Sequence, residues 1–145
     1  MAKSLKNLIA PTTLWAEEIT NRLKRLEDLV AFLGAATFVF RGGVQVGDPG
    51  VGRFYLDNTI KALSTSASVS NITEGGIDID EIYDGVDPGD QMIISQESDP
   101  SRNLHTTVSS VIDNGSWHEF NYTVDASNGG EFQNNRACSI SIIRN

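Results

Sequence analysis

The sequence predicts a mainly β protein, an antiparallel β-sandwich or a small barrel, preceded by one N-terminal coiled-coil helix. The stretch AEEITNRLKRLEDLVAFLG (16–34) has apolar residues at helical spacing. From residue 36 onward, short apolar runs alternate with turns rich in Gly, Asp, Asn and Pro, and an Asn-Gly pair separates two of the longer runs. We therefore divide the chain into an anchor segment (1–12), a helix (13–34) and a β domain (35–145).

Composition limits the function classes. The chain has 145 residues, 39% of them hydrophobic, and a formal net charge of −8. A core can form, and nucleic acid is excluded as a main partner because phosphate binding needs a basic surface. The charge is uneven: segment 1–34 holds five Lys/Arg and four Asp/Glu (+1), and segment 35–145 holds six and fifteen (−9). No run approaches the length of a membrane span, so we expect no membrane insertion.

The helix carries a heptad pattern that predicts a coiled coil. All six seam positions are apolar: Ala16, Leu23 and Val30 at position a, and Ile19, Leu26 and Leu33 at position d. Arg22 at g and Glu27 at e have the spacing of an ion pair between parallel helices. Further apolar residues widen this face, which suits three strands, so we predict a homotrimer. The alternatives are a helix that packs on its own domain or docks on another protein.

The β domain is expected to contain seven or eight short strands and no second helix. Their predicted ranges are 36–41, 53–56, 60–68, 77–80, 92–95, 105–112, 116–124 and 137–143. In the clearest hairpin, Asn114 and Gly115 form a two-residue turn, which would place Ile112 opposite Trp117.

Alternation predicts which strand residues face the core. Phe120, Tyr122 and Val124 share one face of their strand, and Cys138, Ile140 and Ile142 share one face of the last strand. The single cysteine excludes an intrachain disulfide and a Cys-based zinc site, and we expect a buried thiol.

Few residues suggest chemistry. His105 and His118 would lie about 20 Å apart along the predicted hairpin, too far for a joint catalytic or metal site, so we expect structural roles for both. Six acidic residues cluster in one loop: Asp78, Asp80, Glu81, Asp84, Asp87 and Asp90. Calcium binding, or a carboxylate pair of a small hydrolase, are the alternatives to a solvated acidic loop. Ile82 breaks the EF-hand pattern, and we expect no enzyme, no cofactor and no metal.

Several segments together resemble a β domain common in bacteriophage virion proteins. They are ATFVF (36–40), GDPGVGRFYLDN (47–58), VDPGDQMII (86–94), WHEFNYTV (117–124), GEF (130–132) and the closing Ser-Ile-Ser-Ile strand. Such domains occur in tail-fibre and head-fibre chains behind a collagen-like or coiled-coil stalk. This chain has no Gly-x-y repeats, and its heptads occupy that place. The resemblance implies a trimeric virion structural protein, anchored at its N-terminus, and no catalytic residues.

These observations together predict a head fibre that decorates the capsid, or a short tail-associated fibre. The anchor segment would bind a capsid, portal or tail protein through an apolar, weakly basic set of side chains: Lys3, Leu5, Lys6, Leu8 and Ile9. The acidic β domain would contact the host surface, with Trp117 and Tyr55 either stacking on a glycan or buried in the core. The alternative function is a free carbohydrate-binding module that works without the helix.

Overall fold

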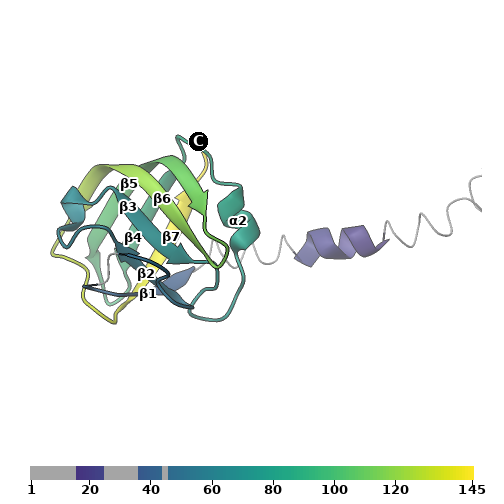
Figure 1. The fold of residues 1–145 in the computed structure, drawn as a ribbon, viewed down its shortest axis with the longest axis horizontal. Helices are drawn as coiled ribbons and strands as arrows, with labels where there is room; N and C mark the ends of the chain where they lie inside the picture. Colours follow the sequence, from purple (N-terminus) through teal and green to yellow (C-terminus); the bar gives the residue numbers. More distant parts are fainter. Residues whose placement is uncertain (1–15, 25–35, 44–45) are drawn as a thin grey trace, which may run out of the picture.

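Seven strands form a closed barrel in the computed structural model, which describes residues 16–24, 36–43 and 46–145 (Figure 1). The strands are β1 (Thr37–Phe40), β2 (Arg53–Leu56), β3 (Ser66–Ser70), β4 (Gln91–Gln96), β5 (Asp99–Asp113), β6 (Trp117–Asn128) and β7 (Ala137–Ile143). Around the barrel they follow the order β1-β2-β3-β6-β5-β4-β7, and β1 also pairs with β7. The pair β1–β2 is parallel, and the other pairs are antiparallel. The mainly β prediction is confirmed, and the barrel is the alternative that forms.

Two short helices interrupt the β domain, so the expectation of no second helix is wrong. A 3-10 helix, η1 (Lys61–Leu63), occupies part of the expected strand 60–68. The expected strand 77–80 is replaced by an isolated bridge at Asp78 and the helix α2 (Asp80–Asp84). Ile77 and Ile79 are spaced two residues apart, as in a strand with one buried face. The residues that the fold buries are Ile79 and Tyr83, whose i,i+4 spacing is helical.

The pairing of β5 with β6 is shifted by two residues from the predicted register, so that Ile112 lies opposite Glu119 instead of Trp117. Asp113, not Ile112, is the last paired residue of β5, and its partner is His118. The side chain of Asp113 accepts a hydrogen bond from the backbone N–H of Gly115 at 2.8 Å, and Gly115 has a φ of 92°. This local bond favours a longer turn over the two-residue loop. As a result, Asp113 and His118 lie side by side across the two strands.

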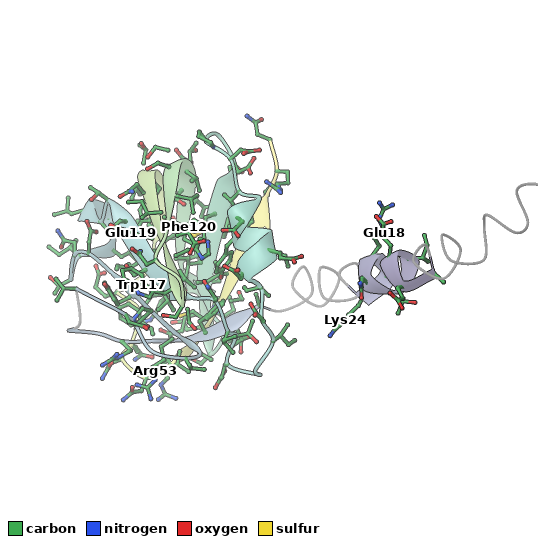
Figure 2. The ribbon with its side chains drawn as sticks, turned by 45° about the vertical axis from the view of Figure 1, so that its right-hand side comes forward. Glu18, Lys24, Arg53, Trp117, Glu119 and Phe120 are labelled. Atoms are coloured by element: carbon green, nitrogen blue, oxygen red, sulfur yellow. The ribbon has the colours of Figure 1, made fainter. Side chains whose placement is uncertain are left out.

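The barrel interior holds the predicted core residues. Phe120 and Tyr122 of β6 are buried, and Val124 is partly buried and packs against the core cluster. Cys138, Ile140 and Ile142 of β7 are buried as well. Figure 2 draws Trp117, Glu119 and Phe120 along β6, where partly exposed and buried side chains alternate. Burial raises the pKa of the Cys138 thiol to about 12, and nearby Glu97 acts in the same direction. The expectation of a buried thiol is confirmed.

Residues 16–24 form a helix, as predicted. Within this helix Arg22 forms an i,i+4 ion pair with Glu18 at 2.6 Å, and both side chains are more than half exposed. The heptad residues Leu26, Glu27, Val30 and Leu33 lie outside the described residues, and so does the anchor set Lys3, Leu5, Lys6, Leu8 and Ile9. Within the described ranges, no helix is long and apolar enough to cross a membrane.

Candidate functional site

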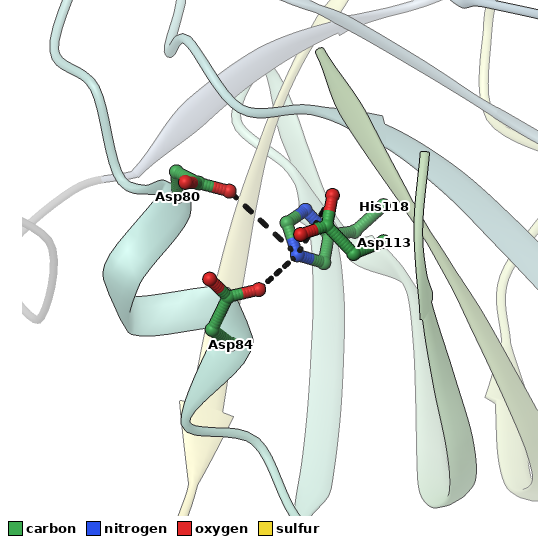
Figure 3. A group of neighbouring side chains, drawn as sticks. All are labelled: Asp80, Asp84, Asp113 and His118. Carbon is green, nitrogen blue, oxygen red and sulfur yellow. Dashed lines mark hydrogen bonds and ion pairs between the residues drawn. The ribbon is translucent and has the colours of Figure 1, made fainter. Parts of the chain in front are cut away.

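Three aspartates surround a buried histidine where the β5–β6 hairpin turns beside α2 (Figure 3). Asp80 and Asp84 come from α2, Asp113 ends β5, and His118 follows the first residue of β6. The Nε2 atom of His118 lies 2.8 Å from Asp84 Oδ1, 3.8 Å from Asp80 Oδ1 and 3.9 Å from Asp113 Oδ1. We call these four residues the Asp–His cluster.

Asn71 determines how the imidazole is oriented. Its side-chain oxygen lies 2.6 Å from His118 Nδ1. Its amide nitrogen donates to Asp80 Oδ1 at 3.1 Å and to the carbonyl of Gly115 at 2.6 Å, both of which are acceptors. These two bonds assign the amide oxygen to the histidine side. His118 therefore donates from Nδ1 to Asn71 and directs Nε2 at the three carboxylates.

Aromatic side chains form the wall behind the histidine. Tyr83 lies edge-on to the His118 ring at 5.5 Å between centroids, and Phe120 stacks on it at 6.3 Å. His118 has no exposed surface, whereas the side chains of Asp80, Asp84 and Asp113 are 40%, 49% and 51% exposed. The imidazole is thus held rigidly from inside, and the carboxylates are accessible from solvent.

The cluster carries an excess of negative charge. Desolvation raises the pKa of Asp80, and repulsion from Asp84 acts in the same direction. Asp113 and Asp78 raise this pKa further, whereas His118 lowers it. A positive charge among these oxygens would relieve the repulsion.

The same geometry bears on nucleophilic catalysis. The hydrogen bonds of the two ring nitrogens of His118 go to Asn71 and Asp84, not to a hydroxyl or thiol. To be activated by this histidine, a nucleophilic hydroxyl or thiol must take the place of Asn71 or Asp84 beside a ring nitrogen. The donor atoms of the cluster, one nitrogen and three carboxylate oxygens, are instead types that bind divalent cations.

Sequence reasoning found parts of this cluster but not the whole. The acidic cluster of 78–90 is visible in the sequence, whereas the sequence gives His118 only a structural role. The shifted hairpin register and the α2 helix bring them together. Asp80 and Asp84 at i,i+4 spacing were the available signal, since a helix would place both on one face. His105 lies elsewhere on β5, paired with Ile93 and Ala126.

The two predicted stacking residues differ in exposure. Tyr55 is 3% exposed, and its hydroxyl donates to the carbonyl of Gly47 at 2.6 Å, so its ring is not available to a ligand. Burial in the core, the other interpretation of Tyr55, is what the structure shows. Trp117 is partly exposed at the start of β6.

A second buried ionisable group has a structural role. Lys61 is 1% exposed, and its ammonium donates to the carbonyls of Asn128 and Gly130 at 2.7 and 2.8 Å. It also lies 5.4 Å from the centroid of the Phe132 ring. Lys61 therefore ties η1 to the loop that follows β6.

No protein-family model, curated protein or solved structure was found to match this chain.

Proposed function

We propose that this chain is a structural protein of a bacteriophage virion, either a trimeric head fibre that decorates the capsid or a short tail-associated fibre. Segment 1–12 binds a capsid, portal or tail protein, and the acidic barrel faces outward, where a host-surface glycan can contact it. The role is structural and adhesive rather than catalytic. The resemblance of residues 36–145 to virion β domains supports this proposal, and the barrel agrees with the mainly β domain that the resemblance implies.

The observation that carries the proposal is the exposed apolar side of helix 16–24. Leu23, at seam position a, is 55% exposed in the single chain, Ala16 is exposed and Ile19 is partly exposed. Burying one leucine side chain contributes about 1.5–3 kcal/mol. A helix this short is marginal alone in water. Sister helices would supply the missing contacts, and the exposed Arg22, which pairs with Glu18 in the single chain, would also pair with Glu27 of a neighbour.

The barrel suits a domain presented in several copies. A closed barrel leaves no unpaired sheet edge, so neighbouring copies have no strands with which to pair. The charge of −9 on segment 35–145 favours solubility and mutual repulsion of the domains. Three domains on one stalk would turn weak individual contacts with a host surface into firm attachment through avidity.

A free carbohydrate-binding module has less support. Trp117 is partly exposed and available for stacking, whereas Tyr55 is buried. This alternative predicts glycan binding that is the same for the trimer and for a monomeric variant. A glycan array probed with both forms tests it, and a blank array removes it.

The trimer is tested by measuring the mass of the full chain in solution. Wild type should have three times the 15.7 kDa of one chain at micromolar concentration. Leu23→Asp should dissociate it, because a carboxylate at the seam is buried without a partner. The control, Asn21→Asp, adds the same charge at an exposed position off the seam and should stay trimeric. A monomeric wild type with an intact helix contradicts the stalk.

The virion assignment is tested separately, by locating the chain in an image of an assembled particle. Copies should be found in threes on the capsid surface or tail, with the barrel outward. Deletion of segment 1–12 should release the trimer from particles without dissociating it. Particles that contain none of this chain would contradict the assignment.

A further inference from the structure

We propose that Asp80, Asp84, Asp113 and His118 bind one divalent transition-metal cation of the Zn²⁺ or Mn²⁺ class as a structural site. The site goes beyond the fibre function and does not depend on it. It would join α2 to the tip of the β5–β6 hairpin.

The donor atoms already surround a common point. All four lie within 4.8 Å of one another, and the histidine-to-carboxylate distances are 2.8, 3.8 and 3.9 Å. A tetrahedral ion with bonds of roughly 2.0–2.2 Å separates its ligands by roughly 3.3–3.6 Å. Shifts of about an ångström in the half-exposed carboxylates reach that geometry, with no movement of His118.

The histidine supplies an observation independent of the acidic residues. Asn71, which is outside the donor set, accepts a hydrogen bond from Nδ1–H, so Nε2 is the ring nitrogen that faces the carboxylates. Nε2 is fully buried: with a proton it donates to Asp84 at 2.8 Å, and without one its lone pair faces carboxylate oxygens alone. A cation between the four atoms satisfies all of them. Metal-binding histidines typically donate their other ring N–H to an oxygen, as His118 does to Asn71.

The donor types select the class of ion. An imidazole nitrogen suits Zn²⁺ and related ions, and three carboxylates suit Mn²⁺, whereas Ca²⁺ takes six to eight oxygen ligands. The four protein ligands fill all positions of a tetrahedral Zn²⁺ ion, whereas Mn²⁺, which prefers six ligands, would add water molecules. With Zn²⁺ the site is closed and structural rather than catalytic, because no position is left for a substrate or a reactive water.

The test uses the untagged full chain, stripped with a chelator and titrated with ZnCl₂ and, separately, MnCl₂ by calorimetry at neutral pH. We expect saturable binding of one ion per chain for at least one metal. In long-range ¹H–¹⁵N spectra, Zn²⁺ should shift the Nε2 resonance of His118. The ring resonances of His105, which is paired with Ile93 of β4, should stay unchanged. Mn²⁺ should broaden the amide signals of α2 and the hairpin tip.

The variant Asp84→Asn/Asp113→Asn should weaken affinity by about 100-fold or more, since it removes two ligands. Both replacements keep an oxygen at the positions that now lie 2.8 Å from His118 Nε2 and from the backbone N–H of Gly115. The control, Glu74→Gln/Asp87→Asn, removes the same charge from exposed positions outside the donor set and should bind as wild type does. If circular dichroism shows the test variant unfolded, Asp84→Asn alone carries the comparison.

Three results would overturn the site. The first is no saturable binding of either metal at millimolar concentration. The second is binding that the Asp84→Asn/Asp113→Asn variant leaves unchanged. The third is a doubly protonated His118 whose Nε2 signal neither metal displaces, which would show an imidazolium–carboxylate ion pair only.

Discussion

The Nε2 atom of His118 lies 2.8 Å from the carboxylate of Asp84, although the two residues are 34 positions apart in the chain. The histidine is fully buried and the aspartate is half exposed. This contact joins helix α2 to the start of strand β6. It therefore links these two segments of the fold in the metal-free protein.

Replacing Asp84 with Ala should destabilise the metal-free protein. The change leaves a buried ring nitrogen without its nearest partner, which costs about 1–3 kcal/mol in the free energy of unfolding. Urea unfolding in the presence of a chelator measures it. The matched control, Asp87→Ala, alters an exposed residue of the same segment and should stay within about 0.5 kcal/mol of wild type. Equal effects of the two changes would show that the His118–Asp84 bond contributes nothing.

Lys61→Met should destabilise the barrel because two backbone carbonyls lose the ammonium that donates to them, and not because packing volume is lost. Methionine fills nearly the same space but donates no hydrogen bond to Asn128 or Gly130. We expect a loss of about 1–3 kcal/mol by urea unfolding. Lys24→Met, on the exposed helix surface, is the control and should have little effect. A Lys61→Met protein as stable as wild type would contradict the role assigned to the ammonium.

Asp90 should make the protein sensitive to acid. Its carboxylate accepts hydrogen bonds from the backbone N–H of Asn145 and of Asp87, and from the Arg144 guanidinium. The two backbone bonds lower the pKa of Asp90, with Arg144 in support and desolvation opposing. Because the folded-state pKa is depressed, this stability is present above the unfolded value of about 3.9 and is lost as pH falls through the lower folded value.

Unfolding in urea at a series of pH values, for wild type and Asp90→Asn, measures this effect. Wild type should be the more stable protein near neutral pH, and its advantage should disappear as the solution is acidified below about pH 4. A constant difference between the two proteins across this range would rule out a contribution from ionised Asp90.

Cys138 should be unreactive in the native barrel. With a pKa of about 12 and no exposed surface, its thiol is almost entirely protonated and shielded at mildly alkaline pH. A disulfide reagent such as DTNB should label the chain at the rate of unfolding, and immediately in concentrated urea. Rapid labelling of the folded protein would show that β7 opens readily or that the thiol is accessible.

Local patterns in the sequence predicted much of the barrel. Strands β2 and β7 have the bounds expected for them, because each is a short apolar or alternating run between clear turns. The core faces of β6 and β7 also follow from alternation, since the side-chain period of a strand is two. These features depend on neighbouring residues only.

The Asp–His cluster could not be predicted in the same way, because it depends on two features that tertiary contacts determine. One is the two-residue change in hairpin register that pairs Asp113 with His118. The other is the helix at Asp80–Asp84, in a stretch whose isoleucines imitate a strand. Tyr55 shows a further limit: alternation does not reveal that a polar hydroxyl has a carbonyl partner inside the fold.

The pairing of β1 with β7 has a consequence for synthesis. The first and last strands of the barrel are neighbours, with Phe38 opposite Cys138, a hundred residues later in the chain. A growing polypeptide cannot complete the ring until β7 has left the ribosome, and until then β1 lacks one of its two partners. Helix 16–24 emerges long before that moment, so it is outside the ribosome while the barrel is still open.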